Sequence, residues 1–119
     1  MLNDFYFVTG KEPVENGFAV RVQFRPDHEI YKVHFPARPI TPGACLLQIA
    51  KNLIEEEVGT KLFTRQIKNI KFLNVINPEV TGSVVFQINL SCIERQVNAT
   101  VTVSDDSNIY AKISASYEK

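Results

Sequence analysis

The sequence predicts an α+β fold in which one long central helix is wrapped by a curved antiparallel sheet. Three observations support this prediction. A single segment, residues 42–58, has a convincing helical pattern. Alternating apolar and polar residues, typical of half-buried strands, occur before and after it, and short turns join the later strands. The length of 119 residues suits one domain, residues 1–119, and leaves no room for a second full core.

Two short strands are expected before the helix. Residues 4–9 form the first. Residues 17–25 form the second, because apolar side chains alternate with smaller or polar ones along them. Pro26 and Asp27 end this strand.

A segment with three prolines connects these strands to the helix. Residues 27–42 contain Pro36, Pro39 and Pro42. Proline lacks a backbone N–H and moves the preceding residue away from helical angles, so neither a helix nor a central strand is expected there. The segment should be a rigid, extended loop.

The helix has recognisable signals at both ends. Thr41 can serve as its N-cap and Pro42 as its first residue, where the missing N–H costs nothing. Gly59 lies where a C-terminal cap belongs. The first half is apolar almost all round and should be buried on most sides, whereas the glutamates at 55–57 should form a solvated face.

The remaining residues predict strands. Residues 61–75 contain one or two strands with a possible bulge, and alternating patterns follow over 84–92, 98–103 and 109–117. Alanines on the inward face of the last strands should leave room for the helix.

Composition excludes some classes of function. Lys plus Arg and Asp plus Glu both number 13, so a net charge of zero gives no general attraction to nucleic acid or to an anionic membrane. No apolar run approaches the roughly 20 residues needed to span a bilayer, and the N-terminus lacks the basic region of a signal peptide. We therefore expect a cytoplasmic protein without a membrane span. Cys45 and Cys92 lack zinc-site spacing and are expected to be buried free thiols.

The segment with the clearest functional signal immediately precedes the helix. Residues 34–43 read His-Phe-Pro-Ala-Arg-Pro-Ile-Thr-Pro-Gly. This run resembles the H-F-P-x-x-P-x-x-P-G signature of the β-hydroxyacyl-carrier-protein dehydratases, and further landmarks extend the resemblance over roughly residues 17–90. The resemblance implies the hot-dog fold, a site formed at a dimer interface and an acyl thioester substrate.

Two residues of this run suit the dehydration of a 3-hydroxyacyl thioester. An imidazole such as that of His34 can remove the C2 proton at neutral pH. The N–H of Gly43 lies at a helix N-terminus and can donate to the thioester oxygen as its charge grows. The resemblance implies the same roles. In the alternative interpretation, His34 pins a loop through a backbone carbonyl and Gly43 allows close packing.

Gln48 departs from the family pattern, in which an acidic residue lies fourteen positions after the motif histidine. An amide can donate and accept hydrogen bonds but cannot supply a proton as a carboxylic acid does. Gln48 could position a water or the substrate hydroxyl, or it could simply be a buried amide satisfied by local backbone. Asp27, His28 and Glu29 remain possible substitutes for the missing acid.

Other residues are candidates for binding. Phe35, Pro42 and Leu47 are expected to contact the substrate, although they could equally stiffen the loop or belong to the core. Carrier proteins are acidic, so Arg38 and Lys32 are candidates for carrier docking. A further set of basic residues follows the helix and could instead be an ordinary solvated sheet edge: Lys61, Arg65, Lys68 and Lys71.

The sequence thus predicts a 3-hydroxyacyl-[acyl-carrier-protein] dehydratase that forms a homodimer. No metal or redox cofactor is implied, because the phosphopantetheine arm of the acyl carrier protein brings the substrate. A thioesterase on the same fold and a non-catalytic acyl-thioester-binding subunit are the alternatives, and Gln48 in place of an acid keeps both open.

Overall fold

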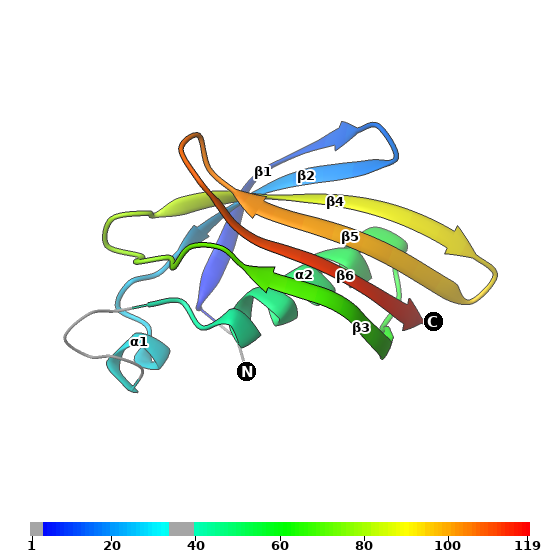
Figure 1. The fold of residues 1–119 in the computed structure, drawn as a ribbon, viewed down its shortest axis with the longest axis horizontal. Coiled ribbons are helices and arrows are strands. Elements are labelled where there is room, and N and C mark those ends of the chain that lie inside the picture. The colour runs from blue at the N-terminus through cyan, green and yellow to red at the C-terminus, as the bar shows by residue number, and fades with distance from the viewer. Residues whose placement is uncertain (1–3, 34–39) are drawn as a thin grey trace.

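The computed structural model describes residues 4–33 and 40–119. Within them, six strands form one antiparallel sheet and two helices accompany it (Figure 1). In chain order the elements are β1 (Tyr6–Val14), β2 (Gly17–Phe24), α1 (Glu29–Val33), α2 (Gly43–Val58), β3 (Phe63–Phe72), β4 (Ser83–Ile93), β5 (Gln96–Ser104) and β6 (Ile109–Glu118). The strands are ordered β1-β2-β4-β5-β6-β3, so β1 and β3 form the two edges.

The hydrophobic core lies between α2 and one face of the sheet (Figure 1). Alternate residues of the central strands, such as Val20, Phe86 and Val101, are almost fully buried, which is the period expected of strands with one covered face. Ala99 and Ala115 are paired across β5 and β6 and belong to this core. Their small size fits the predicted need for space. The α+β prediction is confirmed, with one curved sheet packed on one long helix. The buried residues of α2 are Cys45, Leu46, Ile49, Ala50, Leu53 and Ile54.

β1 is longer than the sequence indicated. It extends to Val14, beyond the predicted end at residue 9, and includes Gly10 and Pro13. Proline is tolerated because β1 is an edge strand, where one row of backbone N–H groups needs no partner in the sheet. The pairing with β2 shifts register between Val8 and Gly10, and this irregularity hides the alternating pattern in the sequence.

The predicted loop over residues 27–42 was wrong in its first part, which contains the short helix α1. All three prolines lie after this helix, so they do not prevent it. His28 precedes α1 and caps its first turn, because its Nδ1 accepts the backbone N–H of Ile30 at 3.1 Å. The side chain of Tyr31 is buried. Residues 34–39, which include two of the prolines, lie outside the described residues.

The C-terminal cap of α2 was predicted correctly, and its N-terminal cap was not. Gly59 adopts φ 80° and its N–H donates to the carbonyl of Glu55 at 2.9 Å, which confirms the C-terminal cap. At the other end, Pro42 occupies the N-cap position and the helix begins at Gly43. The prediction that Thr41 caps the helix was wrong, because its hydroxyl bonds elsewhere.

The glutamates of α2 do more than face solvent. The carboxylate of Glu55 accepts the backbone N–H of Leu62 at 2.7 Å and so fixes the turn that leads into β3. Glu57 forms an ion pair with Lys11 of β1. The predicted solvated face is therefore only partly correct, since two of its three acids contact other elements.

The two cysteines differ in burial. Both are free, as predicted, and burial raises the pKa of the Cys45 thiol. Cys92 is exposed, which contradicts the prediction that both are buried. The pairing of β2 with β4 ends at Asn89 and Leu90 bonds to Asn16 of the turn, so that among the described residues no β2 side chain lies beside Cys92.

Within the described residues, no helix is both long and apolar enough to cross a membrane.

The region 61–75 contains a single long strand, β3, with register shifts at two points along its pairing with β6. This agrees with the expected bulge.

Candidate active site at the start of α2

Three tertiary contacts hold the start of α2. The backbone N–H of Thr41 donates to the carbonyl of Ile76 at 2.8 Å, and the hydroxyl of Thr41 lies 2.8 Å from that of Tyr31. Thr41, Tyr31 and Ile76 are all buried. The segment before the helix is thus attached both to α1 and to the loop that follows β3.

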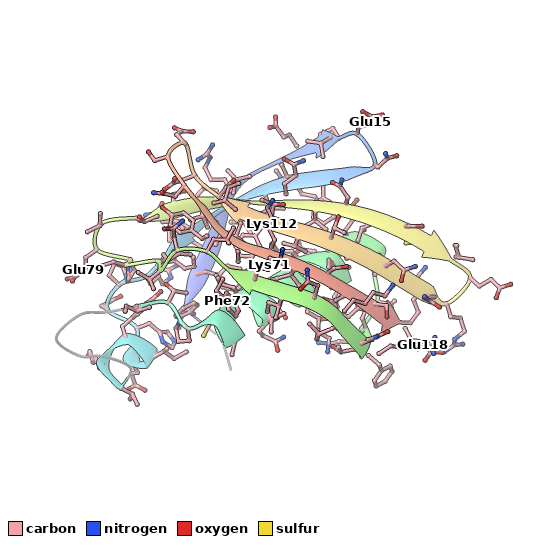
Figure 2. The ribbon with its side chains drawn as sticks, in the orientation of Figure 1. Glu15, Lys71, Phe72, Glu79, Lys112 and Glu118 are labelled. Carbon is pink, nitrogen blue, oxygen red and sulfur yellow. The ribbon has the colours of Figure 1, made fainter. Side chains whose placement is uncertain are left out.

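The third contact joins Gly43 to the end of β3. A Cβ atom placed on Gly43 would lie 2.4–2.9 Å from ring atoms of Phe72, which is too close for a real contact. Figure 2 shows Phe72 where β3 passes the start of α2. A larger residue at position 43 would therefore require the ring of Phe72 to move. This supports the close-packing interpretation of Gly43, and the catalytic role of its backbone N–H stays a prediction.

Tyr31 is a structural anchor of this region. Its ring stacks on that of Phe5, with centroids 5.2 Å apart, and Phe5 also meets the ring of His28 edge-on. Burial raises the pKa of Tyr31 to about 12, despite the opposing effect of the hydrogen bond with Thr41. The phenol is therefore neutral at physiological pH. Because Nδ1 of His28 also holds α1, we assign His28 to the structure of this segment.

The first turn of α2 has backbone donors suited to an anion. Pro42 has no side-chain oxygen with which to cap the helix, and its carbonyl accepts the N–H of Cys45 at 3.0 Å. The N–H groups of Gly43 and Ala44 lie at the positive end of the helix dipole. A developing thioester oxyanion is a suitable partner for such donors.

Gln48 lies one to two turns further along α2 and is half-buried. Its Nε2 donates to Oδ1 of Asn52 at 2.9 Å, and Nδ2 of Asn52 donates to the hydroxyl of Tyr6 at 3.3 Å. The amide is therefore held by side chains, which contradicts the alternative of a purely backbone-satisfied amide. Neither Asn52 nor Tyr6 was predicted from the sequence as a site residue. The spacing of Gln48 and Asn52 by four residues was a signal for the first, whereas nothing local indicated Tyr6.

The other candidate residues have different outcomes. His34, Phe35 and Arg38 lie outside the described residues, so their predicted roles stay predictions. Lys32 is exposed on α1. Pro42 and Leu47 are half-buried, and Leu47 packs against the core.

The basic residues near β3 are all exposed: Lys61, Arg65, Lys68 and Lys71. Lys71 is directly opposite Lys112 in the pairing of β3 with β6 (Figure 2). A polar hollow of about 570 Å³ on the sheet surface is lined by Lys68, Asn89 and Asn98, among others. A second hollow, of about 470 Å³, lies at the C-terminal end of α2 and includes Asn52. Neither hollow is lined by Gly43 or Gln48.

Comparison with known proteins identifies the family. Residues 11–113 match the ApeI-like family, described as ApeI dehydratase. No curated protein matches the chain.

Solved structures of similar shape include dehydratases and thioesterases. The dehydratase heterocomplex ApeI:P from Xenorhabdus doucetiae matches with a TM-score of 0.76 and 14% identity, over 95% of this chain and 97% of that one. A thioesterase described as putative and related to phenylacetic acid degradation, from Ralstonia eutropha JMP134, matches with a TM-score of 0.67 and 14% identity, over 98% and 86%. A mutant thioesterase from Pseudomonas aeruginosa matches with a TM-score of 0.60 and 12% identity, over 91% and 79%.

At such identities the structural matches establish the fold alone, and the fold is the hot-dog fold. The family match covers most of the chain and goes further. Together with the proline-rich segment that leads into a buried helix, it shows that this chain belongs to the ApeI-like family of hot-dog dehydratases.

Proposed function

We propose that this protein catalyses the reversible loss of water from a 3-hydroxyacyl thioester, presented by an acyl carrier protein, to give a trans-2-enoyl thioester. The observation that carries the proposal is the construction of the start of α2. Tertiary contacts fix this turn, its first N–H groups point along the helix axis, and an oriented amide follows at position 48. Membership of a dehydratase family supports the same reaction.

The proposed mechanism assigns one task to each residue. His34 removes the C2 proton, and the N–H of Gly43 stabilises the negative charge that develops on the thioester oxygen. The C3–O bond then breaks. The proton held by His34 passes to the departing hydroxyl, directly or through a water, so that one water molecule leaves. Gln48 positions that hydroxyl, because an amide cannot supply the proton itself.

The substrate requires no resident cofactor, because its thioester and phosphopantetheine arm belong to the carrier protein. Lys32 is exposed on α1, close in sequence to the proposed catalytic histidine. With Arg38 it forms the proposed contact for an acidic carrier. Such contacts accelerate docking through long-range attraction and weaken at high salt.

We further propose that the protein is a homodimer formed through β3. This edge strand and the residues after it expose large apolar side chains, including Phe63 at 72%, Phe72 at 53% and Val75 at 65%. An edge with unpaired backbone groups and exposed apolar side chains favours pairing with another strand. Since Phe72 also covers Gly43, a dimer through β3 would place a second subunit beside the candidate site.

A thioesterase is the second candidate function. It is favoured by the amide at position 48, which can hold a hydrolytic water, and thioesterases share this fold. The third alternative, an acyl-binding subunit, would bind the thioester without turnover.

One experiment separates the three functions. The protein is incubated with a 3-hydroxyacyl thioester of acyl carrier protein, and enoyl absorbance and free thiol are followed together. We expect enoyl formation without thiol release, and loss of that activity in His34→Ala. Thiol release without enoyl product would establish a thioesterase, and binding without either product would establish a binding subunit.

A further inference from the structure

We infer that Tyr6 and Asn52 are positioning residues that orient the amide of Gln48, so that its oxygen faces the hydroxyl or water at the reacting centre. The inference deepens the proposed function and depends on it for its catalytic part. It adds two residues outside the family signature, one on α2 and one on β1.

The three side chains form a continuous hydrogen-bonded chain. Gln48 and Asn52 are one helical turn apart on α2 and are joined at 2.9 Å. Asn52 is joined to Tyr6, 46 residues earlier, at 3.3 Å. All three are half-buried, so each could reach water, yet they bond to one another. The chain thus connects the candidate site to the edge strand β1.

The direction of these hydrogen bonds decides which amide atom of Gln48 can bond to a substrate or a water. Asn52 donates to Tyr6 through Nδ2, so its Oδ1 faces Gln48 and accepts a proton from Nε2. A carboxamide has one acceptor oxygen and one NH₂ donor group. With its nitrogen directed to Asn52, Gln48 presents Oε1 in the other direction.

An acceptor at this position suits the proposed reaction. Oε1 can accept the hydrogen of the C3 hydroxyl, which leaves the lone pairs of the hydroxyl oxygen free to receive a proton. The C3–O bond can then break as that proton arrives, and water leaves. Gln48 itself gains and loses no proton. Its contribution is orientation, and small errors in the orientation of reacting groups reduce rates strongly.

Two substitutions of Asn52 test the direction of the chain. Asn52→Asp provides only acceptors at neutral pH, so it can still receive Nε2 of Gln48 and preserves the inferred direction. Asn52→Leu has similar size and no polar group, so it releases Gln48. We expect kcat to fall about tenfold in Asn52→Leu with KM changed less than about twofold, and to stay within about threefold of the starting enzyme in Asn52→Asp.

A double variant tests whether Asn52 acts through Gln48, and Tyr6→Phe tests the second bond of the chain. In a Gln48→Leu background, Asn52→Leu should cause no further loss of kcat, because residues that act as a unit are not additive. Tyr6→Phe should lower kcat by about threefold, the value of one ordinary hydrogen bond. Lys51→Leu, a neighbouring half-buried residue of α2 outside the chain, is the matched control and should leave kcat unchanged.

A second measurement is independent of turnover. The side-chain NH₂ resonances of Gln48, assigned in the ¹⁵N-labelled protein, should shift in Asn52→Leu and should move in the same direction, but less far, in Tyr6→Phe. If Asn52→Leu leaves both these resonances and kcat unchanged, the inference is wrong. A loss in Asn52→Asp as large as that in Asn52→Leu would show the opposite direction of the chain and would also overturn it. If the enzyme forms no enoyl product, the proposed function fails, and the resonances still decide whether the chain orients Gln48.

Discussion

The two edges of the sheet contribute to the molecule in different ways. β1 has features that discourage pairing with another strand, namely a register shift, Pro13 and the charged pair Lys11 and Glu12. β3 also has lysines and register shifts, but it exposes Phe63, Ile67 and Phe72. Each edge also sends one aromatic residue to α2, since Tyr6 of β1 reaches Asn52 and Phe72 of β3 covers Gly43. The difference supports the proposed homodimer through β3, because β3 exposes the apolar side chains that a second subunit would cover, whereas β1 is the edge less suited to pairing.

The largest expected effect comes from placing a charge on the β3 edge. Ile67→Lys should weaken the dimer by about a hundredfold or more, because a buried, unpaired ammonium group is strongly unfavourable. Light scattering during size-exclusion chromatography at about micromolar concentration would detect the resulting monomer.

Val8→Lys is the matched control on the β1 edge. The exposed fraction of Val8 is 45% and that of Ile67 is 41%, so the two substitutions alter similar surfaces. The Val8 variant should remain dimeric. Dissociation of both variants, or of neither, would remove the distinction between the two edges. A chain that pairs only with a different hot-dog subunit would remain monomeric alone and contradict the homodimer.

The next effect concerns the contact between Phe72 and Gly43. Gly43→Ala should destabilise the protein by about 1–3 kcal/mol, because the added methyl group overlaps the ring of Phe72. The double variant Gly43→Ala with Phe72→Leu should recover much of that loss. Urea unfolding of the four proteins in the cycle measures this coupling. Additive effects of the two substitutions would show that the ring does not restrict position 43.

The smallest effect concerns the anchor on the other side of the helix start. Tyr31→Phe removes the hydrogen bond with Thr41 and should lower the free energy of unfolding by about 1 kcal/mol. The contribution of Tyr31 to the free energy of unfolding should also depend on pH. The pKa of Tyr31 is raised from 10.0 to about 12, so the unfolded chain loses this proton first, and the stability that the neutral phenol provides below pH 10 is lost as the pH rises toward 12.

Unfolding measured between pH 8 and 12 would test this prediction. The decline in stability should be shallower in Tyr31→Phe than in the original protein. It should not vanish, because burial also raises the pKa of Tyr117. Identical slopes in the two proteins would contradict the proposed burial of a neutral Tyr31.

Local sequence signals predicted most of the fold. The positions of β2, β4, β5 and β6 followed from the alternation of apolar and polar residues. Gly59 marked the end of α2, because glycine readily adopts the left-handed conformation that the structure shows there. The errors occurred where neighbours distant in sequence decide the outcome. Thr41 is a good N-cap in isolation, but in the folded chain its hydroxyl pairs with Tyr31. Cys92 continues the apolar alternation of β4, yet the pairing of β2 with β4 ends at Asn89, so no β2 side chain lies beside it.

In the candidate site, too, local features were predicted from the sequence and contacts between distant residues were not. The sequence alone identified the proline-rich segment, Gly43 at a helix start and the amide at position 48, because motif and helical spacing are local properties. Only the tertiary structure brought Phe72 onto Gly43 and Tyr6 within reach of Asn52. These contacts join residues on opposite edges of the sheet to one helix. The packing of that helix against the sheet creates them, and no pattern of nearby residues can specify such packing.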